Sequence, residues 1–121
     1  MDTPPPIYED ELFYFYRCTP QRVIDGDTIV LDIDLGLNIS ITEPCRLSGI
    51  DAPELRGFTR YEGLESKAFL THLIDGDHKF ACQTYKDRTG KYGRYIVTLY
   101  MDDECVNDIM IERGYAKPYV Q

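Results

Sequence analysis

Four acidic side chains lie where a predicted strand gives way to a turn. Asp25 and Asp27 are separated by one glycine, and Asp51 and Glu54 lie in a loop that ends a strand. If Asp27 and Asp51 converge, their carboxylates, a backbone carbonyl and waters form the all-oxygen site that a hard cation such as calcium prefers. Each acid alone is also typical of ordinary turn chemistry. The string Ile-Asp-Gly-Asp occurs twice, at 24–27 and 74–77, and we interpret the second copy as a plain turn.

Two arginines supply positive charge near these acids. Arg46 lies five residues before Asp51, and Arg94 directly follows a Lys-Tyr-Gly turn. A cation and two guanidinium groups would neutralise a phosphate as it gains charge, and a remaining carboxylate would activate water. These are the parts of a metal-assisted phosphodiesterase. A strand arginine on its own is usually a solvated cross-strand partner, so the combination of residues carries the hypothesis.

Hydrophobic patterning predicts the elements that would position these groups. Strict alternation over 29–35 indicates a half-buried strand, and apolar spacing of three and four predicts helices over 62–73 and 103–113. A first predicted strand covers 12–18, is interrupted at Pro20 and resumes at 22–24. The other predicted strands cover 39–50, 79–85 and 95–101. This order, three strands, a helix, two strands and a helix, is typical of a five-stranded OB-fold Greek-key β-barrel with two helices.

Composition predicts one globular domain. The chain has 121 residues, a formal net charge of -8 and 43% hydrophobic residues, which suffices for one core. We expect residues 1–11 to be a flexible acidic and proline-rich lead-in, and 12–121 to form the domain. No apolar window is long enough to span a bilayer and the N-terminus lacks secretory features, so we predict no membrane association and a cytoplasmic location unless a leader was removed. The spacing of four cysteines favours free thiols over disulfides or a thiolate metal site.

One stretch of this acidic chain is locally basic. Residues 79–94 hold five cations against one acid, with Tyr85 and Tyr92 between them and Tyr95 directly after. Such a mixture suits single-stranded nucleic acid, whose phosphates need counter-charge and whose bases stack on aromatic rings. The alternative is a solvated strand edge whose lysines prevent aggregation.

Several strings, taken in order, resemble the staphylococcal (thermonuclease-like) nuclease family. They read VIDGDTIVL at 23–31, RLSGIDAPE at 46–54, GKYGRYIVTLY at 90–100 and VNDIMIERGYAK at 106–117. The resemblance covers about residues 22–117. It implies an OB-fold barrel that hydrolyses DNA or RNA, single-stranded or frayed, with Ca²⁺ and no small-molecule cofactor, leaving 3′-phosphate ends. We expect a monomer or weak dimer. The alternative is a related nucleic-acid-binding module that has lost catalysis.

The resemblance also implies a role for individual residues. Asp27, Asp51 and the backbone carbonyl of Ala52 would bind calcium, and Asp25 would hold a metal-bound water. Glu54 would be the general base. The remaining implied roles concern the substrate: Arg46 and Arg94 would clamp the scissile phosphate, Lys91 and Tyr92 would contact a terminal phosphate, and Tyr119 would line the nucleotide site.

The chain also departs from the family pattern. The hairpin between Leu31 and Arg46 is longer than usual, Gly90 replaces an expected aspartate, and the loop after Glu54 is trimmed. The family's usual third C-terminal helix is expected to be absent. From the acidic composition we expect weak electrostatic capture of nucleic acid and a strong dependence on a bound cation.

Overall fold

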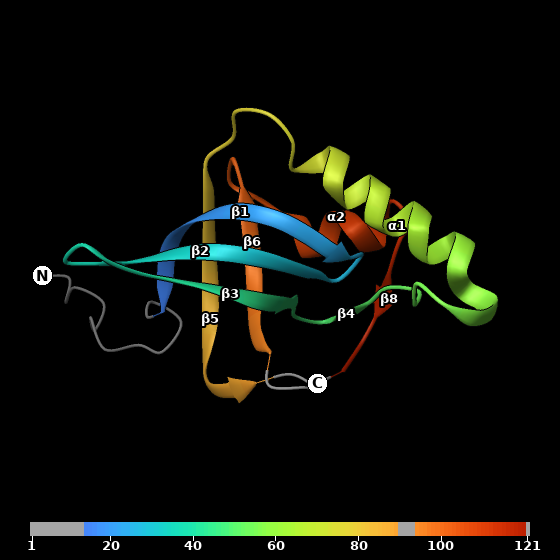
Figure 1. Cartoon of the computed structure of the whole chain (residues 1–121), viewed down its shortest axis with the longest axis horizontal. Coiled ribbons are helices and arrows are strands. Elements are labelled where there is room, and N and C mark those ends of the chain that lie inside the picture. The colour runs from blue at the N-terminus through green and yellow to red at the C-terminus, as the bar shows by residue number, and fades with distance from the viewer. Residues whose placement is uncertain (1–13, 90–93, 121) are drawn as a thin grey trace, which may run out of the picture.

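The computed structural model describes residues 14–89 and 94–120, which form a strongly curved sheet with two helices (Figure 1). Helix α1 packs against β1, and helix α2 packs against β6. The elements are β1 (Phe15–Asp25), β2 (Thr28–Gly36), β3 (Ile39–Leu47), β4 (Ile50–Asp51), η2 (Gly57–Thr59), α1 (Arg60–Leu73), β5 (Phe80–Thr89), β6 (Tyr95–Met101), β7 (Glu104–Cys105), α2 (Val106–Glu112) and β8 (Lys117–Pro118).

The five long strands close into a barrel. Antiparallel pairing gives the order β3-β2-β1-β5-β6, and parallel pairing of β3 with β6 joins the two ends. The closing register places Cys45 opposite Tyr95 and Leu47 opposite Val97. This closure, with one helix after the third long strand and another after the fifth, confirms the predicted OB-fold Greek-key barrel.

Two element boundaries were predicted wrongly. The predicted interruption at Pro20 is an irregularity inside one continuous strand, because β1 pairs with β2 on both sides of a register shift between Pro20 and Arg22. Such a bulge lets a proline lie in a strand without removing a needed donor. The second helix begins at Val106 instead of 103, because Asp102 and Asp103 adopt positive φ angles in a tight turn between β6 and β7.

The barrel interior follows from the period-two pattern. Ile29, Leu31 and Ile33 alternate along β2 and are buried in the core, where Leu70 of α1 and Met110 of α2 join them. All four cysteines are free thiols, three of them buried. Neither helix of the described residues is long and apolar enough to span a membrane.

The second Ile-Asp-Gly-Asp string connects α1 to β5. Asp75 and Asp77 are exposed there, and the Asp75 carbonyl lies 2.8 Å from Nε2 of His78. The other imidazole nitrogen, Nδ1, lies 2.6 Å from Oδ2 of Asp102 in the turn after β6. The surroundings of this copy differ entirely from those of Asp25 and Asp27, in keeping with its interpretation as a plain turn.

A buried amide extends the seam where the barrel closes. β3 pairs with β6 only as far as Val97, and Asn107 of α2 then satisfies the backbone groups beyond that point. Its side-chain oxygen accepts a hydrogen bond from the Leu99 amide at 2.9 Å, and its side-chain nitrogen donates to the Ser48 carbonyl at 2.8 Å. Asn107 therefore substitutes for strand pairing where β3 turns away.

We expect Asn107→Ala to lower the free energy of unfolding by about 2–4 kcal/mol, because buried backbone groups lose their partners. Chemical denaturation monitored by circular dichroism measures this change. Glu112→Ala, at an exposed position of the same helix, is the matched control. A loss below about 0.5 kcal/mol would show that water or backbone rearrangement replaces the amide.

Candidate active site

The predicted acids meet where the β1–β2 turn approaches β4. The Asp27 carbonyl accepts a hydrogen bond from the Leu47 amide at 2.7 Å, which fixes the turn against the end of β3. Oδ2 of Asp27 accepts a second bond from the Ala52 amide at 2.9 Å. Two chain segments that are 25 residues apart are thereby joined through one carboxylate that is only 7% exposed.

Arg46 lies between the two predicted calcium ligands. Its Nη1 is 3.5 Å from Oδ2 of Asp27, and its Nη2 is 3.4 Å from Oδ1 of Asp51. Nη2 also donates to the Ile50 carbonyl at 3.0 Å. The guanidinium group thus offsets part of the negative charge that the fold concentrates here.

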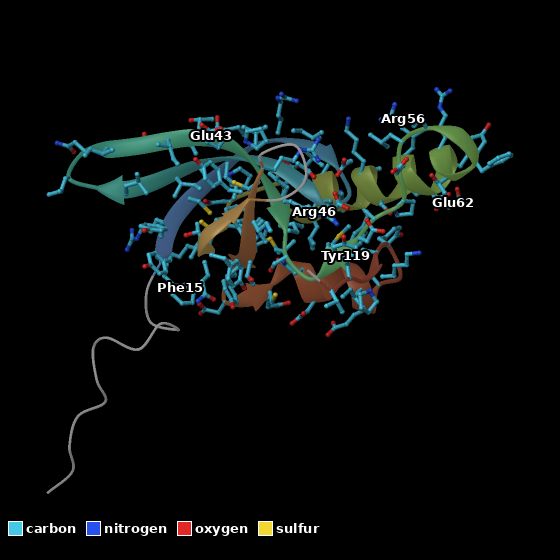
Figure 2. The ribbon with its side chains drawn as sticks, turned by 90° about the horizontal axis from the view of Figure 1, so that it is seen from below. Phe15, Glu43, Arg46, Arg56, Glu62 and Tyr119 are labelled. Atoms are coloured by element: carbon cyan, nitrogen blue, oxygen red, sulfur yellow. The ribbon has the colours of Figure 1, made fainter. Side chains whose placement is uncertain are left out.

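Tyr119, near the end of the described chain, lies against the guanidinium group of Arg46. The centroid of its ring lies 5.1 Å from Cζ of Arg46, a cation–π distance, and Figure 2 shows the two side chains close together. Pairing of β8 with β4 and a 2.8 Å hydrogen bond from the Tyr119 amide to the Gly49 carbonyl hold the ring in place. Tyr119 therefore lies beside Arg46, and its predicted role in lining the nucleotide site stays a prediction.

Arg94 approaches the same carboxylate through a threonine. Nη1 of Arg94 donates to Oγ1 of Thr28 at 3.3 Å, and that hydroxyl donates to Oδ1 of Asp27 at 3.0 Å. Thr28 is fully buried, so its hydroxyl orientation is set by these two partners. Sequence reasoning assigned Thr28 no role at the site and missed this connection. Its position at the start of a buried strand was the available signal.

Burial makes the Asp27 carboxylate costly to ionise. Desolvation, reinforced by the hydrogen bond and charge of Asp25, raises the pKa of Asp27 to about 6, against the opposing effects of the Ala52 amide and Arg46. Oδ1 of Asp25 accepts a hydrogen bond from the Asp27 amide at 3.1 Å, so part of its role is turn chemistry. A divalent cation would stabilise the ionised form of Asp27, and oxygen donors suit calcium.

The described residues contain no group of three or more Asp, Glu, His or Cys side chains arranged to hold a metal ion. A cation at this site would therefore depend on the Asp27 and Asp51 carboxylates, a backbone oxygen such as that of Ala52, and water. This is a sparse set of protein ligands, but it is the kind of oxygen set, completed by water, that calcium accepts.

Glu54 lies in the loop between β4 and η2 with its side chain exposed. Among the described residues its carboxylate forms no ion pair. Its main chain is fixed, because the Thr59 hydroxyl donates to its carbonyl at 2.9 Å. A cavity of about 450 Å³ borders this loop and opens between Asp51, Glu54, Tyr115 and Lys117. The structure thus places Glu54 beside a space next to Asp51 without bringing it into contact with Arg46.

Two glycines let the loops of the site pack closely on α1. A Cβ atom on Gly26 would lie 2.6 Å from Cβ of Ser66, and one on Gly63 would lie 2.4 Å from the Glu54 carbonyl oxygen. Neither separation is possible between real atoms without movement. The hydroxyl of Ser66 also donates to the Tyr115 carbonyl at 2.6 Å, which ties the C-terminal segment to the same helix. Sequence reasoning did not single out Gly63, although a glycine inside a helix was a visible signal.

Lys91 and Tyr92 lie outside the described residues, in the gap 90–93 within the basic stretch 79–94. Their predicted contacts with a terminal phosphate stay predictions.

Gly63→Ala tests whether α1 fixes the Glu54 loop. Alanine favours a helix over glycine by about 1 kcal/mol, but here the clash with the Glu54 backbone should dominate and lower the free energy of unfolding by about 1–3 kcal/mol. Denaturant titration of the variant measures this change in the free energy of unfolding. Glu65→Ala, exposed on the same helix, is the control that reports helix propensity without a clash. A Gly63→Ala protein more stable than wild type would refute the close packing.

The raised pKa of Asp27 predicts that the free energy of unfolding depends on pH. In the fold Asp27 keeps its proton up to about pH 6, whereas in the unfolded chain it loses the proton near its ordinary value of 3.8. Because the folded state binds more protons in this window, this contribution to stability falls as pH rises from about 4 to about 6. Without divalent cations, Asp27→Asn should therefore gain stability relative to wild type across the window. Denaturation at several pH values measures the difference, and a difference constant with pH would contradict the assignment.

Comparison with known proteins agrees with this geometry. The family model described as staphylococcal nuclease homologue matches residues 44–121. A thermonuclease from Staphylococcus intermedius is 30% identical over 101 residues, a match that covers 80% of this chain and 56% of that protein. The chain thus spans little more than half the length of this relative. The family match, the closed barrel and the site built around Asp27 lead to one conclusion: the chain belongs to the staphylococcal nuclease family.

Proposed function

We propose that this chain is a calcium-dependent nuclease that hydrolyses phosphodiester bonds in DNA or RNA, preferably single-stranded or frayed, and leaves 3′-phosphate ends. The observation that carries the proposal is the convergence of two arginines on the buried carboxylate of Asp27: Arg46 of β3 directly, and Arg94, the residue before β6, through the Thr28 hydroxyl. Two guanidinium groups around one anionic centre form a site where a phosphodiester can be bound and its developing charge stabilised.

Calcium would be held by Asp27, Asp51 and the carbonyl of Ala52, with Asp25 accepting a hydrogen bond from a bound water. The burial of Asp27 supports this assignment, because a desolvated carboxylate gains most from a neighbouring cation. When bound, the ion would act as a Lewis acid that neutralises charge on the phosphate. The residues themselves would supply the oxygen donors.

The arginines would bind the non-bridging oxygens of the scissile phosphate. A planar guanidinium can donate two parallel hydrogen bonds to a phosphate, which a lysine cannot. In the structure Arg46 bonds to carboxylates and to the Ile50 carbonyl, and Arg94 bonds to Thr28. These partners hold both side chains near the place where the phosphate would lie, so little ordering remains to be done on binding.

Glu54 would take the proton from the attacking water. Its exposed carboxylate beside the cavity has no ion-pair partner among the described residues that would hold it elsewhere. Tyr119 would line the nucleotide site from above Arg46, and Lys91 and Tyr92 would contact a terminal phosphate.

Glu54→Gln should lower turnover about 100-fold or more, because the amide cannot accept the proton. The assay is hydrolysis of a labelled single-stranded oligonucleotide with calcium, with magnesium and with a calcium chelator. Glu62→Gln is the matched control, since Glu62 is an exposed glutamate nearby on α1 (Figure 2) and should leave turnover unchanged. Near-normal turnover of Glu54→Gln would remove it as the base.

A nucleic-acid-binding module is the second candidate. Among the described residues Glu54 forms no ion pair with Arg46, so the observed contacts do not join the proposed base to the phosphate clamp, and this favours the binding module. Oligonucleotide binding without hydrolysis under any of the three metal conditions would select this alternative.

A further inference from the structure

The segment that follows Glu54 has an unusual composition for this acidic chain. Residues 55–61 read Leu-Arg-Gly-Phe-Thr-Arg-Tyr and contain two cations, two aromatic rings and no acid. We name these seven residues the η2 platform. Phe58 is fully exposed and Tyr61 is 80% exposed, so both rings lie on the surface beside the arginines.

The platform is ordered by its own contacts. The Thr59 hydroxyl lies within hydrogen-bonding distance of two carbonyls, Glu54 at 2.9 Å and Arg56 at 3.3 Å. The Arg60 amide donates to the Gly57 carbonyl, which closes the short 3₁₀ turn, and Gly57 has the positive φ that the turn requires. The rings are therefore held outward by a defined backbone. Because both large aromatic side chains stay exposed, they do not add the stability that burial in a core would give.

The cations of the platform are available to a partner. Among the described residues neither Arg56 nor Arg60 forms an ion pair, whereas Arg46 is engaged with two carboxylates. Figure 2 shows Arg56 at the outer end of the molecule near the start of α1, with Arg46 and Tyr119 nearer the barrel. The exposed Glu54 and Glu62 flank the platform, so it offers phosphates the individual guanidinium donors of Arg56 and Arg60 and no net positive charge.

We propose that the η2 platform is an extended subsite that binds single-stranded nucleic acid beyond the scissile phosphate. Phe58 and Tyr61 stack on bases, and Arg56 and Arg60 contact phosphates, the combination that single-strand binding uses. Continuity with the site supports this occupant, because the platform begins at the residue after Glu54 and Gly63 holds the Glu54 backbone directly against α1. This inference rests on the proposed function. It adds that the substrate is single-stranded and extends beyond the scissile phosphate.

The test compares Phe58→Ala, Tyr61→Ala and the double variant with wild type on a single-stranded 12-nucleotide substrate and on a dinucleotide. Wild type should have a lower KM for the longer substrate. We expect each single variant to lose about threefold to tenfold of that preference and the double variant to lose most of it, with kcat changed little. Leu37→Ala is the matched control, because Leu37 is 93% exposed at the distant β2–β3 turn (Figure 1) and should keep the preference.

The outcomes separate the two proposals. Wild-type hydrolysis with an unchanged length preference in the double variant would overturn the η2 platform and leave the nuclease standing. Equal losses on both substrates would also overturn it, since the rings would then be shaping the catalytic site. If wild type neither cuts nor binds either substrate, the proposed function fails and the platform fails with it. Thermal unfolding of each variant checks that exposed rings were removed without loss of the fold.

Discussion

Burial of the Asp27 carboxylate is the constraint on which the arrangement of the site depends. A carboxylate that is almost fully removed from water must be compensated by donors or cations, and here the Ala52 amide, the Thr28 hydroxyl and Arg46 supply them. Each partner comes from a different part of the β1–β4 region. Satisfying one charge therefore fixes the turn after β1, the end of β3 and the start of the Ala52 loop relative to one another.

Close packing on α1 fixes further segments around Asp27. Gly26 and Gly63 remove the side chains that would keep the turn and the Glu54 loop away from the helix, and Ser66 links the helix to Tyr115. Tyr115 stacks on Phe69 of the same helix with ring centroids 4.1 Å apart. Helix α1 is thus a shared support for the acid loop and for the C-terminal segment that brings Tyr119 to Arg46.

Much of this could be predicted from the sequence because the signals are local. The alternation along β2 and the turn at Asp25 and Asp27 depend on a few neighbouring residues, and the strand order predicted the barrel. The four sequence segments that resemble the nuclease family, taken in order, placed the acids and both arginines in one predicted site. The continuous strand through Pro20 could not be predicted, because its pairing with β2 overrides a local breaker. Thr28 and Asn107 each reach a partner far away in sequence, Arg94 and Ser48, which no local pattern reveals, and the helical glycine at Gly63 was visible although its contact with the Glu54 backbone was not.

The charge distribution explains how an acidic protein could handle a polyanion. The net charge of -8 repels nucleic acid at long range, but screening limits that repulsion to about 8 Å at physiological ionic strength. At contact distance the proposed nucleic-acid substrate would meet what the fold exposes locally. Near the site these groups are the partly buried Arg94 and the two exposed arginines of the η2 platform, Arg56 and Arg60, whereas the Arg46 side chain is only 13% exposed. Because short-range contacts would then have to supply most of the binding energy, the proposed aromatic stacking would carry more weight here than on a basic surface.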